Sequence, residues 1–352
     1  MRFMVMTVIH CIWSFEVGGA ETMLVDIVNR QCRTDRVFVV IVNNIYDKNL
    51  LGTIAPDVEV VRLERRPGSK SIWWLVRLYS LFARLRPDVI HVHNHDLLKV
   101  ISRHAAKALF FTAHALSVPV ENLHGGVTAV AISHAVADDL KRRNAKSKIV
   151  TIPNGVDVDA IKFKQDSTAD GKVRLVQVGR LNVGIKGQDL LLECLARLQR
   201  DGHAGYEVHF IGTGPDRQML EDMASESGIT DSVFFHGGLS RRELYGSLCT
   251  YDIMVHPART EGFGLVIAEG LAAGLKMVVS DIAGPVEVVD GGRRGLVVEK
   301  DNPDALARAV LRATEENPDR SVFRRAMKDL YSVDLQVERY RQAYADAING
   351  KR

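Results

Sequence analysis

Two Rossmann-like domains, each a parallel β-sheet covered by helices, are the α/β fold that this sequence predicts. Its 352 residues exceed the size at which a single hydrophobic core keeps growing, so two domains are expected. Short apolar runs alternate with stretches whose apolar residues recur with the period of a helix, which is typical of parallel strands joined by helical crossovers. Between Asn154 and Lys172 this rhythm fades into polar residues such as Asp166 and Ser167, which marks a linker.

The apolar runs fall into two series. The first covers residues 3–8, 37–42, 58–63, 88–93, 109–113 and 127–132, and the second covers residues 173–178, 206–211, 232–235, 252–256, 277–280 and 295–298. We therefore expect an amino-terminal domain over residues 1–160 and a carboxy-terminal domain over residues 161–333. A final helix is expected over residues 334–352, capped by Asp334 and with Val337, Tyr340 and Tyr344 on one face.

The composition is that of an ordinary globular protein, with 46% hydrophobic and 25% charged residues. No apolar run is long enough to span a membrane, and the apolar start, Met1 to Trp13, alternates like a strand and lacks a cleavage site of small residues. The 4 cysteines are scattered, without the spacing of a metal site or a disulfide framework. We therefore expect a cytoplasmic protein.

Charge is distributed unevenly along the chain. Residues 1–170 contain 22 Lys and Arg against 17 Asp and Glu, or +5, whereas the remainder contains 24 against 26, or −2, and the sum of +3 is too small to indicate nucleic-acid binding. Within the basic half, residues 71–86 combine apolar and aromatic residues with Arg77, Arg84 and Arg86, and no acid occurs between Glu64 and Asp88. This stretch is typical of a helix that contacts an anionic lipid interface and also of a crossover helix that packs on a sheet.

A carboxylate pair is the most informative local feature. Glu261 lies in a glycine-containing turn, and Glu269 lies one turn into a helix that is expected to begin near Leu265. Backbone N–H groups at a helix start can hold phosphate oxygens, while carboxylates accept hydrogen bonds from hydroxyls. The segment therefore suits a phosphorylated sugar, although a loop acid and a solvated helix residue give the same pattern.

Two cations bracket a strand-to-helix loop upstream of this pair. Arg180 follows the apolar run that ends at Val178, and Lys186 precedes a periodic helical stretch. At the carboxyl end of a strand, a forked guanidinium and a mobile ammonium suit a diphosphate, whereas isolated surface cations would serve solubility.

Taken in order, these motifs resemble those of the retaining glycosyltransferases of family 4, glycosyl transferases group 1. That family has the GT-B fold, in which the parallel sheets of two Rossmann-like domains face each other across a cleft. The resemblance covers nearly the whole chain. Its motifs are Gly18-Gly19-Ala20-Glu21, Phe111-Thr112-Ala113-His114, Pro153-Asn154-Gly155-Val156-Asp157, Gly179-Arg180, Lys186-Gly187, Gly212-Thr213-Gly214-Pro215 and the segment from Glu261 to Glu269.

The resemblance implies a role for individual residues. It assigns His114 and Glu261 to the transferred sugar, Arg180 and Lys186 to the leaving diphosphate, and Glu269 to the ribose hydroxyls. Further substrate contacts are expected from Gly18, Gly19, Gly212, Gly214, Leu239, Gly262, Phe263, Gly264 and Leu265. Leu239 lies in the segment expected to face the base, and Phe263, Gly264 and Leu265 are expected to supply backbone N–H contacts to sugar and phosphate.

The implied activity is transfer of a hexosyl residue from a nucleotide diphosphate sugar to a glycan or lipid-linked acceptor. A UDP-sugar is the first expectation for the donor and GDP-mannose the second, in synthesis of a cell-surface polysaccharide or lipopolysaccharide, without cofactor or metal. An anionic membrane surface, at the inner face of the cell membrane, is a further expected partner. The resemblance also implies that the final helix crosses back to the first domain.

Other interpretations of the same sequence remain open. A nucleotide-sugar epimerase and a non-catalytic sugar-nucleotide sensor would use the same architecture, whereas a nicotinamide oxidoreductase is disfavoured because residues 212–217 lack the third glycine of the dinucleotide fingerprint. Two short patterns are candidate metal sites: Asp157-Val158-Asp159, and the alternating His91, His93 and His95.

Overall fold

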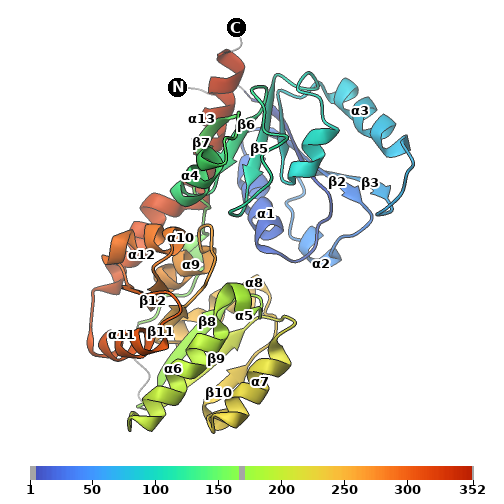
Figure 1. Ribbon diagram of the computed structural model, residues 1–352. Helices are drawn as coiled ribbons and strands as arrows, with labels where there is room; N and C mark the ends of the chain where they lie inside the picture. Colours follow the sequence, from blue (N-terminus) through green and yellow to red (C-terminus); the bar gives the residue numbers. More distant parts are fainter. Residues whose placement is uncertain (1–4, 166–170, 351–352) are drawn as a thin grey trace. The chain divides into compact units, whose positions relative to one another are not determined.

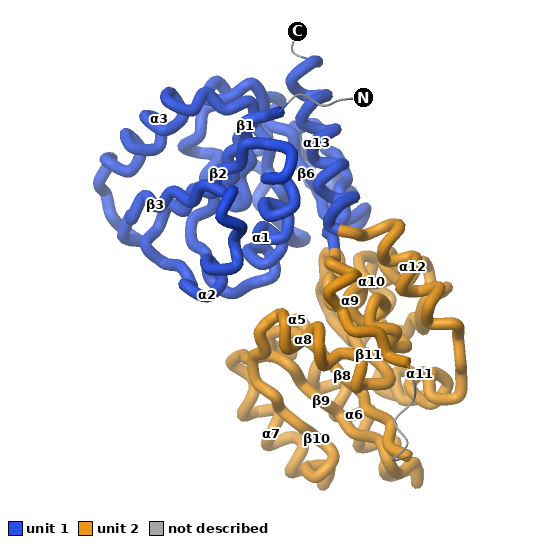
Figure 2. The backbone as a smooth tube through the Cα atoms, turned by 180° about the vertical axis from the view of Figure 1, so that it is seen from behind, with its two compact units in different colours: residues 1–155, 333–352 blue, residues 156–332 orange. Residues whose placement is uncertain are grey.

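The computed structural model describes residues 5–165 and 171–350, and the chain forms two compact units (Figure 2). Unit 1 comprises residues 1–155 and 333–352, and unit 2 comprises residues 156–332. The sequence placed these boundaries after residues 160 and 333. Part of the predicted linker, residues 166–170, lies outside the described residues.

Unit 1 contains a seven-stranded sheet in which every strand pair is parallel. Its strands are β1 (Thr7–Ile12), β2 (Arg36–Asn43), β3 (Glu59–Arg65), β4 (Val89–Val92), β5 (Ala108–Ala113), β6 (Thr128–Ala131) and β7 (Lys148–Thr151), in the order β3-β2-β1-β4-β5-β6-β7. The order reverses between β1 and β4, which creates the kind of switch point where α/β sheets bind ligands.

The helices of unit 1 include the last helix of the chain (Figure 1). They are α1 (Gly19–Gln31), α2 (Lys48–Leu51), α3 (Trp73–Leu85), η1 (His95–Lys99), α4 (His134–Arg142) and α13 (Val333–Asn349). Helix α13 packs its Tyr340 and Tyr344 into one core with Met23 and Ile27 of α1 and Phe110 of β5. The apolar face that the sequence predicted for this helix is thus the face that it buries in unit 1.

Unit 2 contains a six-stranded parallel sheet in the order β10-β9-β8-β11-β12-β13. Its strands are β8 (Val173–Val178), β9 (Tyr206–Ile211), β10 (Val233–Phe235), β11 (Ile253–His256), β12 (Lys276–Ser280) and β13 (Leu296–Val298). Its helices are η2 (Val158–Ala160), α5 (Val183–Lys186), α6 (Gln188–Arg200), α7 (Arg217–Glu226), η3 (Thr230–Ser232), α8 (Arg241–Ser247), η4 (Leu248–Thr250), α9 (Leu265–Ala273), α10 (Ala283–Val288), η5 (Asp290–Gly292), α11 (Pro303–Glu315) and α12 (Arg320–Tyr331). Leu191 and Leu195 of α6 share a core with Val208 of β9 and Val310 of α11.

The predicted fold class, two Rossmann-like domains with parallel sheets, is confirmed. Two strands differ from the prediction. Strand β1 begins at Thr7, whereas the apolar run begins at Phe3, which lies outside the described residues. Strand β7 was missed, because it is a short edge strand with only two apolar residues between Lys148 and Thr151. In the described part of the chain, no helix combines the length and the apolarity that crossing a bilayer requires.

Candidate active site

Three loops of unit 2 meet at the carboxyl ends of β8, β9 and β11. Strands β8 and β11 are neighbours at the point where the strand order reverses. The backbone joins the loops directly: Leu181 N–H donates to the Thr213 carbonyl at 3.0 Å, and Arg259 N–H donates to the Ile185 carbonyl at 2.8 Å. Residues 179–187, 212–216 and 257–264 therefore form one connected surface, on which most of the predicted site residues lie.

The glycines of these loops permit a close backbone approach. A Cβ atom on Gly212, whose φ is 141°, would lie 2.0 Å from the Gly179 carbonyl oxygen, and one on Gly214 would lie 2.1 Å from the Leu181 carbonyl oxygen. Any side chain there would force the β8 and β9 loops apart. Packing alone therefore accounts for both glycines, and their contact with a ligand stays a prediction.

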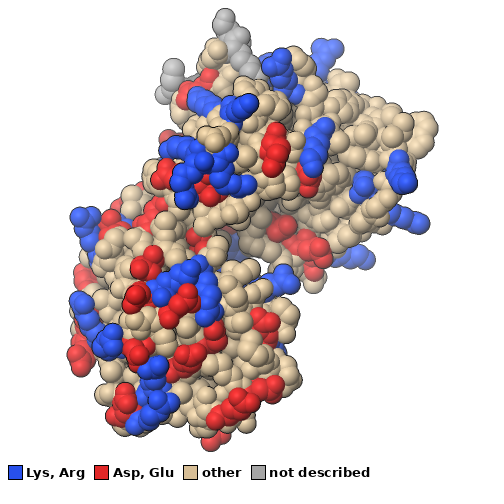
Figure 3. All heavy atoms as spheres, in the orientation of Figure 1, with Lys and Arg blue, Asp and Glu red and all other residues tan. Residues whose placement is uncertain are grey.

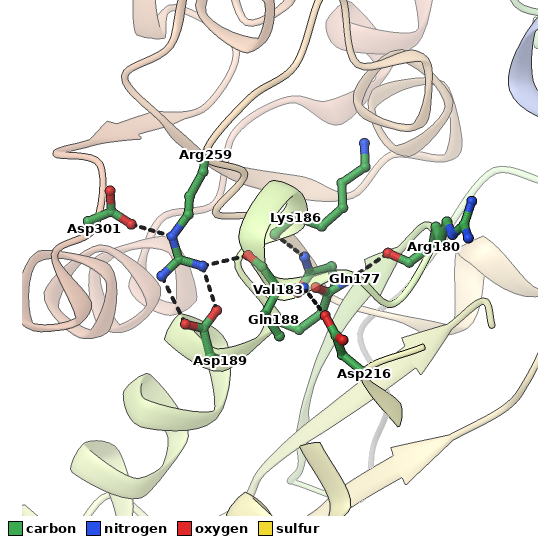
Figure 4. Close-up of polar contacts among 9 residues, drawn as sticks. All are labelled: Gln177, Arg180, Val183, Lys186, Gln188, Asp189, Asp216, Arg259 and Asp301. Atoms are coloured by element: carbon green, nitrogen blue, oxygen red, sulfur yellow. Dashed lines mark hydrogen bonds and ion pairs between the residues drawn. The ribbon is translucent and has the colours of Figure 1, made fainter. Parts of the chain in front are cut away.

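The loop that carries Arg180 and Lys186 is fixed at both ends by side-chain amides (Figure 4). Gln188 Nε2 donates to the Arg180 carbonyl at 2.9 Å, and Gln177 Nε2 donates to the Lys186 carbonyl at 2.7 Å. Between them, Asp216 accepts from the Val183 N–H at 2.8 Å. The backbone under each cation is therefore held in place.

Arg259 anchors the same loop from the other side (Figure 4). Its guanidinium makes a two-pronged contact with Asp189, both bonds being 2.8 Å, and also donates to Asp301 at 2.7 Å and to the Val183 carbonyl at 2.6 Å. Such forked pairs are among the stronger polar contacts in proteins. The sequence did not single out Arg259. Its position two residues before Glu261 marks it as part of the site, but only the structure shows that its charge is already paired.

Lys186 and Glu261 form an ion pair, with Nζ and Oε2 2.6 Å apart. On the other side of the carboxylate, His256 Nε2 lies 3.4 Å from the same oxygen. Burial raises the pKa of Glu261, but the His256 ring and the Lys186 ammonium together outweigh burial and hold the pKa well below its ordinary value. Glu261 is therefore an ionised carboxylate at neutral pH.

His256 is a site residue that the sequence analysis missed. It is the last residue of β11 and is fully buried, and burial lowers its pKa although the neighbouring Glu261 acts in the opposite direction. Neither ring nitrogen makes a well-formed hydrogen bond with any of the residues that the structure describes. The available sequence signal was its place at the end of a predicted strand, five residues before Glu261.

Arg180 differs from the other cations of the site. Its side chain is exposed, and it makes no hydrogen bond or ion pair within residues 5–165 and 171–350. Figure 4 shows it leaving the loop on the opposite side from Arg259. Arg180 is therefore available to an anionic ligand without first losing a protein partner.

Helix α9 begins after Gly264, whose φ of 88° lies in the left-handed region. Ile267 N–H bonds back to the Gly264 carbonyl, so the earlier N–H groups of Leu265 and Val266 have no partner within the helix. The Gly262 N–H donates to Glu261 Oε1 at 3.1 Å, and the Phe263 ring is buried against Tyr331. Of Phe263, only the backbone can face a ligand.

Glu269 is buried on α9 and is held by a second pair of side chains that the sequence did not identify. Tyr245 Oη donates to Glu269 Oε1 at 3.0 Å, and Arg241 Nη2 donates to Tyr245 Oη at 2.6 Å. Leu239, which is partly exposed, lies just before the capping box that starts α8 at Ser240. Glu269 is thus oriented by α8, the helix that follows the segment expected to face the base.

The predicted residues of unit 1 lie at the carboxyl ends of its own strands. Gly18 and Gly19 start α1, and a Cβ atom on Gly18 would lie 2.5 Å from the Glu21 carboxylate, whereas one on Gly19 would meet open space. His114 follows β5, is partly exposed, and its Nε2 lies 3.2 Å from His93 Nδ1. The structure gives Gly18 a packing reason and leaves the backbone at Gly19 accessible.

The histidine-rich segment does not present the three predicted imidazoles on one strand face. His95 begins η1 and pairs with Asp96 at 3.3 Å, and His10 of β1 instead joins His91 and His93. Ligand atoms of those three lie within 4.8 Å of one another, but every ring nitrogen is already hydrogen-bonded, to Gln31, Thr112, Tyr344 or another histidine. A metal ion would have to break these bonds.

The Asp157-Val158-Asp159 segment has a structural partner. Asp159 accepts from Lys328 of α12 at 2.8 Å, and both side chains are exposed. This ion pair joins η2 to α12 within unit 2.

Two Rossmann-like units with parallel sheets of seven and six strands define the GT-B fold of glycosyltransferases. The solved structures of Anabaena Alr3699/HepE in complex with UDP and glucose (TM-score 0.81, 19% identity, covering 97% of this chain and 100% of that one) and of sucrose-phosphate synthase from Thermosynechococcus elongatus (TM-score 0.77, 16% identity, 98% and 100%) share it.

Family models identify the particular family. The model for Glycosyltransferase Family 4 matches residues 17–160, and the model for Glycosyl transferases group 1 matches residues 158–329. The chain belongs to glycosyltransferase family 4, in group 1.

Two curated relatives are mannosyltransferases by name. The GDP-mannose-dependent alpha-(1-6)-phosphatidylinositol monomannoside mannosyltransferase of Mycobacterium tuberculosis is 33% identical over 178 residues, 45% of each chain, so the match spans about half the length of that relative. The GDP-mannose:cellobiosyl-diphosphopolyprenol alpha-mannosyltransferase of Xanthomonas oryzae pv. oryzae is 26% identical over 97% of both chains.

Proposed function

We propose that the protein is a retaining, metal-independent glycosyltransferase that moves a hexosyl residue from a nucleotide diphosphate sugar to a glycan or lipid-linked acceptor. The observation that carries the proposal is the 2.6 Å ion pair between Lys186 and Glu261. Lys186 lies on the loop that also presents the unpaired Arg180, and Glu261 lies on the loop that follows β11. A sugar diphosphate offers anionic oxygens to the two cations and hydroxyls to the carboxylate, so one ligand satisfies all three groups.

Each residue then has a distinct task. Arg180 and Lys186 stabilise the negative charge that grows on the leaving diphosphate, a role that a divalent metal fills in other enzymes. The N–H groups of Leu265 and Val266 provide further donors at the start of α9. Glu269 binds the ribose hydroxyls, and Tyr245 orients its carboxylate by donating to Oε1.

Glu261 is better suited to orient the sugar than to remove a proton. Its pKa is depressed by His256 and Lys186 despite burial, so the carboxylate is a weak base at neutral pH. This supports a retaining path in which the leaving diphosphate, and not a glutamate, helps to deprotonate the acceptor.

A donor panel tests the proposal without knowledge of the acceptor. The protein is incubated with UDP-sugars and with GDP-mannose, and nucleotide release is measured with and without a chelator. Frequency within the family favours a UDP-sugar, whereas the names of the two relatives favour GDP-mannose. We expect nucleotide release that is abolished by Lys186→Ala. Neither Lys328→Ala nor the chelator should change it. Loss of release with the chelator would refute metal independence.

Product analysis separates the rival functions. Retention predicts that the transferred sugar keeps the anomeric configuration of the donor. Conversion of the donor without any acceptor would favour an epimerase, and donor binding without transfer to any acceptor in a broad panel would favour a sensor.

We also propose that α3 contacts an anionic membrane surface, which would place the protein near lipid-linked acceptors. Leu78, Leu81 and Phe82 of α3 are buried, as expected of a crossover helix, but Ile72 and Trp73 at its start are 66% and 71% exposed. The exposed stripe continues through Val76, Tyr79 and Ala83 to Arg86, and it borders a cavity of about 650 Å³ that Lys107 also lines.

Charge on this part of unit 1 supports the lipid contact. The side chains of Arg77, Arg84 and Arg86 are exposed, and Figure 3 shows separate Lys and Arg groups among tan residues on this side of unit 1. Sedimentation with anionic phosphatidylglycerol vesicles, but not with zwitterionic phosphatidylcholine vesicles, is expected, and it should weaken in high salt. Trp73→Ser should reduce binding, whereas Val322→Ser, at an exposed site of unit 2, should not. Equal binding to both vesicle types would overturn the proposal.

A further inference from the structure

Four buried or half-buried polar side chains of unit 1 form a continuous hydrogen-bonded chain that ends at His114. Gln31 Oε1 bonds to His10 Nε2 at 2.9 Å, His10 Nδ1 bonds to His93 Nε2 at 3.0 Å, and His93 Nδ1 bonds to His114 Nε2 at 3.2 Å. This hydrogen-bonded chain of side chains runs from Gln31 at the end of α1, across β1 and β4, to His114, the residue that follows β5.

Sheet register explains why these residues meet. The order β1-β4-β5 makes the three strands neighbours, and His10 lies opposite His91 in the pairing of β1 with β4. His91 and His93 are two residues apart and share a face of β4, and the rings of His10 and His93 are stacked with centroids 5.3 Å apart. His10 and His93, which are 83 positions apart in the sequence, are thereby brought together with His91 in one column of stacked histidine rings.

All three imidazoles of the chain are neutral at physiological pH. Burial lowers the pKa of His10 and of His114 to about 4, and burial, with the neighbouring histidines, lowers the pKa of His93 well below its ordinary value. A neutral imidazole carries one N–H and one lone pair. Each nitrogen-to-nitrogen bond must therefore take a donor from one ring and an acceptor from the next.

The group that Gln31 presents to His10 consequently determines the tautomer of all three histidines. The Gln31 amide is oriented with Oε1 toward His10 and with its Nε2 buried without a hydrogen-bond partner among the described residues. In this orientation Oε1 can only accept, so His10 carries its proton on Nε2 and accepts at Nδ1 from the Nε2–H of His93. His93 then accepts at Nδ1 from the Nε2–H of His114. His114 is left with a lone pair on Nδ1, and this atom has no hydrogen-bond partner among the residues that the structure describes.

We propose that Gln31, His10 and His93 are positioning residues that hold His114 as its Nε2–H tautomer, so that Nδ1 accepts a hydrogen bond from a hydroxyl of the transferred sugar. This inference rests on the proposed function, because the transferred sugar of that function supplies the hydroxyl that donates to His114 Nδ1. The other tautomer would present an N–H at Nδ1 and would favour an acceptor atom on the ligand instead.

His91 provides an internal comparison. Its ring stacks on that of His93 with centroids 4.7 Å apart and is equally buried, but its nitrogens bond to Tyr344 Oη at 2.6 Å and Thr112 Oγ1 at 2.7 Å. Its hydrogen bonds stay within the core and do not reach His114. A change at His91 or its partners therefore tests the packing of the stacked histidine rings, whereas a change at Gln31 tests the tautomer of His114.

Nitrogen-15 NMR of the histidine-labelled protein, without any donor, is the direct test, because a protonated and an unprotonated ring nitrogen give separate signals. In the wild type we expect His114 to carry its proton on Nε2. Gln31→Leu should convert this single state into a mixture, and Gln31→Glu, which keeps an accepting oxygen, should restore it. Thr112→Val, which removes a bond to His91 outside the chain, should leave the His114 signals unchanged.

Turnover is the second measurement. Gln31→Leu should lower kcat by about tenfold, the value of roughly one hydrogen bond, with little change in KM for the donor, and Gln31→Glu should recover most of the loss. A wild-type His114 protonated on Nδ1, or a Gln31→Leu protein with unchanged His114 signals, would overturn the inference. So would an altered tautomer with unchanged kcat. Failure of every donor in the panel would instead refute the proposed function, and the NMR result would be independent of it.

Discussion

Replacing Lys186 by methionine removes the ammonium group but keeps most of the length of the side chain. In the structure this ammonium lies 2.6 Å from Glu261, and the two side chains are 22% and 18% exposed. Breaking a fully buried pair by removing one partner costs about 3–5 kcal/mol. Because both groups here are partly exposed and His256 remains beside the carboxylate, we expect Lys186→Met to lower the free energy of unfolding by about 1–2 kcal/mol.

The double variant Lys186→Met/Glu261→Gln removes both charges and should recover most of that stability. Turnover should not recover, because the loss of one preorganised group that stabilises developing charge costs about 100- to 1000-fold in kcat. Lys328→Met is the matched control: it breaks an exposed pair with Asp159, and such pairs contribute about 0–1 kcal/mol.

Chemical denaturation and donor hydrolysis measure the two effects on the same samples. The pKa of Glu261 is lower in the folded protein, so its contribution to stability is present above the unfolded pKa of about 4.3 and is lost as the pH falls further. The stability difference between the wild type and Glu261→Gln should therefore change below that pH and stay constant near neutrality. If Lys186→Met turned over the donor as fast as the wild type, the catalytic role of the ammonium would be refuted. If the double variant were as unstable as Lys186→Met alone, the ion pair would not be the source of the lost stability.

Three further variants test other parts of the site. Arg259→Lys should lower stability by about 2 kcal/mol in thermal unfolding and reduce turnover, since lysine cannot replace the forked contact with Asp189; unchanged turnover would show that the loop needs no such anchor. Gly212→Ala should cost at least about 3 kcal/mol, because its Cβ would lie 2.0 Å from the Gly179 carbonyl oxygen, whereas Gly19→Ala, with open space around it, should be nearly neutral; equal effects in denaturation would contradict the geometry. Tyr245→Phe removes the hydroxyl that donates to Glu269 and should raise KM for the donor several-fold with a loss of about 1 kcal/mol in stability; a change in kcat alone would argue against ribose binding by Glu269.

The sequence predicted much of the fold, because long apolar runs and helical periodicity record burial directly. Strand β8 agrees with its predicted residues, and the face of α13 that carries Tyr340 and Tyr344 is buried as its spacing indicated. Strand β7 has too few apolar residues to be recognised. Where periodicity is weak, as at a sheet edge, local sequence holds little information about structure.

The candidate site was predicted only in part, for a related reason. The motifs assigned Lys186 to the diphosphate and Glu261 to the transferred sugar of one donor, and the structure brings the two side chains into contact. The sequence alone could not show that the charge of Arg259 is already neutralised by Asp189, which is 70 residues earlier in the chain, or that His256 lies beside Glu261. Such partners depend on which strands are neighbours, and a single sequence does not state that.

The place of α13 in unit 1 has a consequence for synthesis of the protein. Unit 2 is one uninterrupted segment, whereas unit 1 needs residues from both sides of it. Until Val333–Asn349 leaves the ribosome, His91 lacks its bond to Tyr344 and the core around Phe110 stays open to water. We therefore expect the amino-terminal unit to stay unfinished, and open to chaperone binding, until α13 has been synthesised.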